Sequence, residues 1–168
     1  MTVLNHRFAG RLDFFTNDPE FAGPYPNENV AFGLRFNTDL TSFGIVDFVT
    51  LVVPDIPTKF LVTDTLTVTH QGGEPGVFDA STGSASVLVK LRFSHEIAGP
   101  FPNPAPSKLR LIMTTNATKL PDDKTAGQPL DLGVGEVDWV GTGMFKEGHL
   151  AGTSCWVHVT GHLTPAPT

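Results

Sequence analysis

Residues 84–94 read SASVLVKLRFS, and apolar side chains alternate with mostly polar ones along the stretch. Successive side chains of an extended strand point to opposite sides of a sheet. One face therefore carries only apolar residues, namely Ala85, Val87, Val89, Leu91 and Phe93. The pattern predicts an antiparallel strand with one buried and one solvated face.

The same period-2 pattern recurs along the chain. Thirteen Phe, 17 Gly and 14 Pro favour strands separated by turns, and no segment shows a long helical period. Alternation covers at least part of eight segments: 3–16, 29–37, 44–53, 59–70, 84–94, 108–115, 134–145 and 150–163. About eight such strands predict an all-β fold, and we expect a closed or nearly closed antiparallel barrel; a two-layer sandwich is the alternative.

Size and charge limit the classes of protein. The 168 residues suit one domain spanning 1–168. The net charge of -6, with no basic cluster, argues against a nucleic-acid partner. No apolar run approaches the ~20 residues of a membrane helix and no export signal is visible, so we expect a cytoplasmic protein without a membrane partner.

Motifs for metals and cofactors are missing from the sequence. A lone cysteine, Cys155, builds neither a disulfide framework nor a multi-cysteine zinc site. The histidines are scattered, and no phosphate-binding loop, dinucleotide fingerprint or nucleophile elbow occurs. We therefore predict no metal and no cofactor.

One six-residue phrase occurs twice, as AGPYPN at 22–27 and AGPFPN at 98–103. Each copy follows one predicted strand and precedes another. Prolines remove backbone donors and fix φ, so each copy should leave the sheet as a stiff loop that holds Tyr25 or Phe101 over the barrel. The repeat is explained by an internal duplication or by similar turns on similar hairpins.

Two aspartates form the predicted catalytic pair. A turn centred on 54–57 pairs Val49 with Val62 and Asp47 with Asp64, which places two carboxylates in an apolar strip. Close carboxylates in a poorly solvated site share a proton, which suits acid and base catalysis. A buried arginine that neutralises the pair, a bulge that turns one aspartate outward, or a calcium site are the alternatives.

The C-terminal segment predicts an aromatic pocket. A turn at Glu147-Gly148 places Trp139 opposite Trp156, with His158 on the same face. Such a face forms the floor of a ligand pocket, or equally a plug for a small barrel. The predicted ligand-binding residues are Tyr25, Leu34, Phe101, Trp139, Trp156 and His158.

Two further segments suggest covering layers. The polar loop 116–133 reads as a flap over one barrel mouth or as a disordered surface loop. In the segment 44–53, Val46, Phe48, Thr50 and Val52 form a second, moderately apolar face. Such a face indicates cover by another element or by a second copy of the chain, so a homo-oligomer is among the expected partners.

The C-terminal hairpin also resembles a known group of barrels. The glycine rhythm GTGMFKEGHLAGT at 141–153, followed by an alternating strand and Gly161-His162-Leu163, is similar to the closing strands of small calycin-like barrels of the allene oxide cyclase and dirigent type. The resemblance implies a barrel that encloses an apolar small molecule, and some members guide cyclisation by shape. It matches no family motif position by position and adds no catalytic residue.

These observations favour a barrel that binds a hydrophobic small molecule. In the leading hypothesis the protein is a cyclase or isomerase in which Asp47 and Asp64 transfer a proton. In the second it carries the molecule unchanged. In the third the barrel is a structural module whose outer strands build an oligomer.

Overall fold

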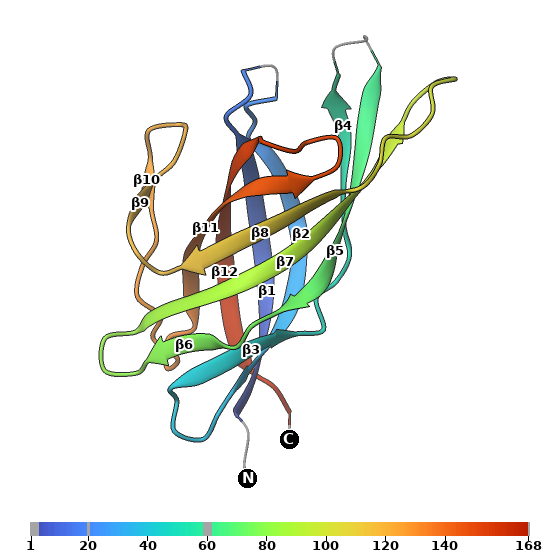
Figure 1. Cartoon of the computed structure of the whole chain (residues 1–168). Helices are drawn as coiled ribbons and strands as arrows, with labels where there is room; N and C mark the ends of the chain where they lie inside the picture. The colour runs from blue at the N-terminus through green and yellow to red at the C-terminus, as the bar shows by residue number, and fades with distance from the viewer. Residues whose placement is uncertain (1–3, 20, 59–61, 168) are drawn as a thin grey trace.

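The computed structural model describes residues 4–19, 21–58 and 62–167. The described residues form strands and connections, with no helix among them (Figure 1). No helix long and apolar enough to cross a bilayer occurs in these ranges. The strands are β1 (Leu4–Thr16), β2 (Tyr25–Phe36), β3 (Ser42–Val46), β4 (Leu51–Pro57), β5 (Thr63–Gly73), β6 (Gly76–Asp79), β7 (Ser84–Ile97), β8 (Ser107–Thr114), β9 (Thr118–Lys119), β10 (Thr125–Ala126), β11 (Glu136–Glu147) and β12 (Ser154–Pro165).

Eight strands close into an antiparallel barrel. Their order is β7, β6, β3, β2, β1, β12, β11 and β8, and β8 pairs back onto β7. The hairpin of β4 and β5 continues outside this ring, with β5 on β7 beside β6. Closure gives every ring strand a partner on each side along at least part of its length, and it confirms the predicted all-β barrel over the sandwich.

The alternation that predicts the strands also places the core. In β7 the five apolar side chains of one face are at most 6% exposed, and they face inward with the apolar residues of β8. On β1 and β12, Gly10 and Gly161 stand opposite each other beneath the ring of Phe8. A Cβ on Gly161 would lie 2.7 Å from that ring, so glycine is required where the ring crosses the seam.

The segment 44–53 is two strands rather than the predicted single one. β3 ends at Val46 and β4 begins at Leu51. Between them Asp47 has a positive φ of 52°, which breaks the extended backbone. The short strand β6 was not predicted. Residue 3 and residues 59–61 of the predicted strands lie outside the described residues.

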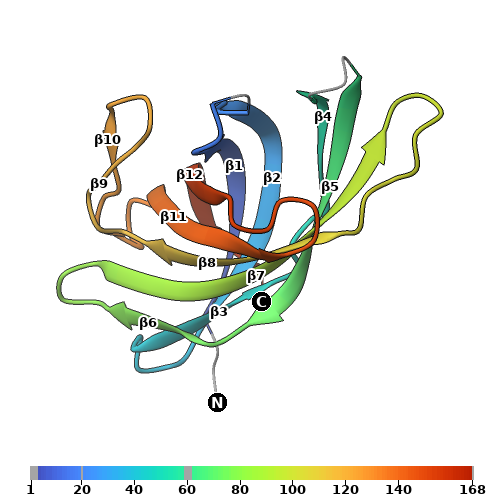
Figure 2. The same ribbon diagram turned by 45° about the horizontal axis from the view of Figure 1, so that its top comes forward.

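Four connections meet at one end of the barrel, where β1 joins β2, β4 joins β5, β7 joins β8 and β11 joins β12 (Figure 2). The second copy of the repeated phrase lies in the connection from β7 to β8, outside the strands, as predicted. The first copy enters the sheet, because Tyr25 and Pro26 already pair with Phe14 and Asp13. The prediction that it stays outside is wrong for this half.

The first part of the segment 116–133 covers the outer face of the barrel, whereas Leu130 near its end packs into the main core. It contains the β9–β10 hairpin, whose Leu120 and Ala126 pack against Phe15, Val140 and Trp156. The Gly127 N–H donates to Asp138 of β11 at 3.0 Å. Burial of Leu120 and Ala126, at 3% and 5% exposed, explains why this polar segment is ordered.

Candidate functional site

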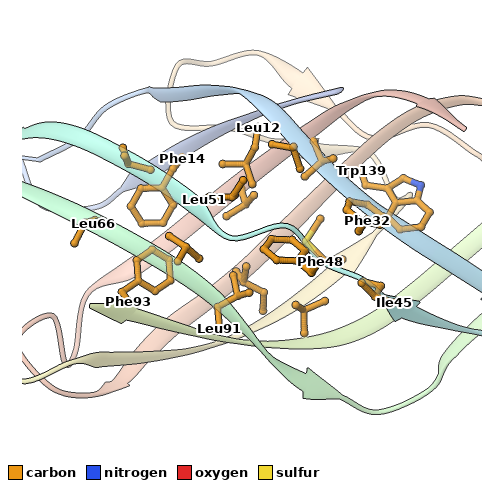
Figure 3. Close-up of a pocket in the computed structure, with 18 residues that line it drawn as sticks. Leu12, Phe14, Phe32, Ile45, Phe48, Leu51, Leu66, Leu91, Phe93 and Trp139 are labelled. Carbon is orange, nitrogen blue, oxygen red and sulfur yellow. The ribbon is translucent and has the colours of Figure 1, made fainter. Parts of the chain in front are cut away.

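A small apolar cavity lies in the middle of the barrel. Its volume is about 50 Å³, and its walls are entirely apolar (Figure 3). The lining includes Leu12, Phe48, Val68, Leu91, Met113 and Trp139. Apolar cavities of this kind stay dry, because water gains no hydrogen bonds in them.

A larger pocket opens at the end where the four connections meet. Its volume is about 370 Å³, and most of its wall is apolar. We call it the mouth pocket. Its walls include Phe21 and Tyr25 from one side, Ile56 and Asp64 from another, and His149 and Leu150 from the β11–β12 connection. A mainly apolar concave surface with a few polar groups is typical of small-molecule sites.

Behind the mouth pocket, three polar side chains form a buried chain of hydrogen bonds. Asp64 Oδ2 lies 2.7 Å from His95 Nδ1, and His95 Nε2 lies 2.9 Å from Ser107 Oγ. The N–H of Glu96 donates to Asp64 Oδ1 at 3.0 Å, and the N–H of Leu150 donates to Ser107 Oγ at 3.0 Å. All three side chains point inward because they follow the alternation of β5, β7 and β8.

One arrangement of protons satisfies every member of this chain. The Nδ1–H of His95 donates to the Asp64 carboxylate, and the Ser107 hydroxyl donates to His95 Nε2. The order of groups is that of a serine-hydrolase triad. Ser107 is fully buried, however, and its oxygen already accepts the Leu150 N–H. The chain therefore anchors the β11–β12 connection and orients Asp64, which alone of the three lines the pocket.

Two acidic side chains lie among the described residues that line the pocket. Asp18 and Asp64 both line it, and its described lining residues include no lysine or arginine. Burial, and secondarily the negative charge of Asp18, raises the pKa of Tyr25. The Tyr25 phenol therefore stays protonated at neutral pH and can donate a hydrogen bond. His149 adds an imidazole at the pocket wall, 5.5 Å from the buried His95 ring between ring centres.

The predicted pairing of Asp47 with Asp64 is wrong. Asp64 pairs with Ile56, because the Thr58 N–H bonds to the Val62 carbonyl and a bulge falls between Val53 and Ile56. Asp47 is exposed in the bend between β3 and β4. Asp64 is buried at 6% exposure, with His95 as its partner in place of a second carboxylate.

The predicted aromatic floor is also wrong. Trp139 pairs with Val159, and Trp156 pairs with Thr142, so the two indoles lie on opposite faces of the sheet. Trp139 points into the central cavity, whereas Trp156 packs under the β9–β10 hairpin. His158 shares the outer face with Trp156 and lies 2.8 Å from Asp138. A register shift of an odd number of residues explains the change of face.

Of the remaining predicted ligand-binding residues, only Tyr25 reaches the mouth pocket. Its ring lies 6.5 Å from that of Phe14, between centres. Phe101, in the second copy of the phrase, is 49% exposed and lines neither the central cavity nor the mouth pocket. Leu34 faces inward and is buried in the core, outside the walls of both spaces.

Sequence reasoning missed His95 and Ser107. A signal for both exists, since His95 continues the inward alternation of Leu91 and Phe93, and Ser107 continues that of Leu109. The described residues hold no group of three or more His, Cys, Asp or Glu side chains placed to bind a metal ion. Cys155 is buried, and burial raises the pKa of its thiol to about 12.

Comparisons of the chain with protein-family models, curated proteins and solved structures found no match. The fold and the site therefore define the class by themselves. This class is a closed, eight-stranded antiparallel barrel with a mostly apolar pocket at one end and a buried carboxylate–imidazole–hydroxyl chain behind it.

Proposed function

We propose that the protein binds a small, mostly apolar molecule in the mouth pocket. The observation that carries the proposal is the pocket itself, about 370 Å³ in volume, with apolar walls and Asp64 fixed on one side. This volume lies within the range of small-molecule sites. A ligand site in a closed antiparallel barrel also agrees with kinship to the calycin-like barrels of the allene oxide cyclase and dirigent type.

Blocking the pocket tests the proposal. Ile56 lines the mouth pocket, whereas Val52 on the same strand is 52% exposed and lines neither interior space. Ile56→Trp should fill the pocket, and Val52→Trp is the matched control. Titration with the uncharged fluorescent probe N-phenylnaphthylamine should show binding to the parent and to Val52→Trp, and at least a tenfold loss in Ile56→Trp. Equal binding by all three proteins contradicts the proposal.

A second candidate function is proton transfer by Asp64. The supporting observation is a carboxylate at an apolar pocket wall, held from behind by His95 and the Glu96 N–H. A positioned carboxylate with few waters around it is suited to general-base catalysis. It would suit an isomerase or cyclase that moves a proton on its ligand.

Nitrobenzisoxazole is an apolar probe that opens when a base removes its carbon-bound proton. The parent protein should accelerate this opening, and Asp64→Asn should lose the acceleration. Asp47→Asn should keep it, because Asp47 is exposed and does not line the mouth pocket. Unchanged acceleration in Asp64→Asn contradicts the catalytic role. The binding proposal is tested separately by the fluorescent probe.

A further inference from the structure

We propose that the ligand is a single-chain amphiphile whose polar head donates hydrogen bonds or carries a positive charge. The head lies beside Asp64 in the mouth pocket, and the end of the chain passes Phe14 into the central cavity. The inference rests on the proposed function, since it assigns the ligand of the same pocket.

The two spaces adjoin inside the barrel. Phe14 and Leu66 line both the mouth pocket and the central cavity. Figure 3 shows these two side chains at one end of the cavity and Trp139 at the other. The Phe14 ring is packed among Tyr25, Phe93 and Phe145, at centre distances of 5.7–6.5 Å. Phe14 and Leu66 therefore stand between the two spaces, and the proposed path along the barrel requires the Phe14 ring to turn aside.

The central cavity selects the tail. Its wall exposes no polar atom, so any polar group placed there loses its hydrogen bonds to water without replacement. Its 50 Å³ has room for about two methylene groups, which excludes rings and branched ends. The fitting occupant is the end of one unbranched hydrocarbon chain.

The mouth pocket selects the head. The Asp64 carboxylate lines it, and its described lining residues include no lysine or arginine. Another carboxylate brought against Asp64 is repelled, whereas an amine is attracted and an alcohol can donate a hydrogen bond. An alkylamine fits this carboxylate, and an alkanoic acid of equal length does not.

Chain-length dependence of binding tests this arrangement. Each methylene buried in the protein should tighten the binding of a linear alkylamine by about fourfold, until the path is full. Val89 and Val159 line the central cavity but not the mouth pocket, so Val89→Leu should remove room for about one methylene there. Val77→Leu is the matched control, because Val77 is 67% exposed on the outside.

Calorimetric titration of an alkylamine series should show a shorter limiting chain in Val89→Leu than in the parent and in Val77→Leu. Short amines should bind all three alike. Val159→Leu repeats the test if Val89→Leu does not fold.

An unchanged limiting length in both cavity variants overturns the tail position, while probe binding still supports the mouth pocket. Equal or tighter binding of the matched alkanoic acids overturns the head assignment. Binding of the fluorescent probe without binding of any amine overturns the amphiphile inference alone. Absence of both contradicts the proposed function as well.

Discussion

Truncation of the Asp64–His95 pair should show strong coupling between the two side chains. Asp64→Ala removes a charge-assisted bond of 2.7 Å to His95 and the acceptor of the Glu96 N–H. Hydrogen bonds to charged groups contribute about 1.5–3 kcal/mol each, and water entering from the adjacent mouth pocket offsets part of the loss. We expect Asp64→Ala to lower the free energy of unfolding by about 2–4 kcal/mol.

His95→Ala should cost about 3–5 kcal/mol, because it leaves a buried carboxylate unpaired and opens a cavity. In the double variant the shared bond is lost only once. The loss of free energy of unfolding in the double variant should therefore be smaller than the summed losses of the two single variants by about 1.5–3 kcal/mol. Urea unfolding at neutral pH, with linear extrapolation to water, measures all four free energies.

The outer pair of Asp138 and His158 is the matched control, with a bond of 2.8 Å but side chains 24% and 21% exposed. Solvent screening should keep the coupling of this pair below about 1 kcal/mol. A coupling free energy for Asp64 and His95 within about 0.5 kcal/mol of zero would refute the buried chain of hydrogen bonds.

Three other outcomes follow from packing and protonation. Val89→Leu should raise the free energy of unfolding, by at most about 1.2 kcal/mol for the 50 Å³ cavity, as thermal unfolding can show. Gly161→Ala should lower the free energy of unfolding by about 1–3 kcal/mol or more, since its Cβ would lie 2.5 Å from the Ala9 carbonyl oxygen. Gly44→Ala is the control and should lower it less, because no atom lies within 4 Å of the added Cβ. Equal melting temperatures of the two variants would contradict this reasoning. Burial lowers the pKa of His6 below 6.5, so the unfolded chain binds more protons at this residue than the folded chain does. The free energy of unfolding should therefore fall as the pH drops below 6.5. In urea titrations, His6→Leu should weaken this dependence on acid.

The sequence predicts the barrel because the inward faces of its strands depend on local alternation. The side chains at 85, 87, 89, 91 and 93 are buried as expected. Local alternation does not predict the register between two strands, since the register depends on where a turn begins. The prolines at 54 and 57 suggest a turn, but both lie within β4, and the reversal comes after Pro57. Because the turn was placed too early, Asp47 was predicted as the partner of Asp64, whereas the observed partner is Ile56.

The candidate site was predicted only in part. Tyr25 and Asp64 were selected from sequence and both line the mouth pocket. His95 and Ser107 were not selected, because each lies one residue beyond a predicted strand, 84–94 or 108–115. Their hydrogen bonds join β5, β7 and β8, and pairing across three strands is fixed only when the register of all three is known.

The seam between β1 and β12 sets a condition on how the chain folds. It pairs His6 with Pro165 and Thr16 with Cys155, so the first strand finds its second neighbour only among the last residues of the barrel. Contacts so distant in sequence cost much loop entropy and slow folding. During synthesis one edge of β1 stays unpaired until β12 has left the ribosome. In that interval the edge can pair with strands of other chains. Rapid dilution from denaturant should therefore cause aggregation at high protein concentration. More protein should aggregate the longer β1 and β12 take to pair.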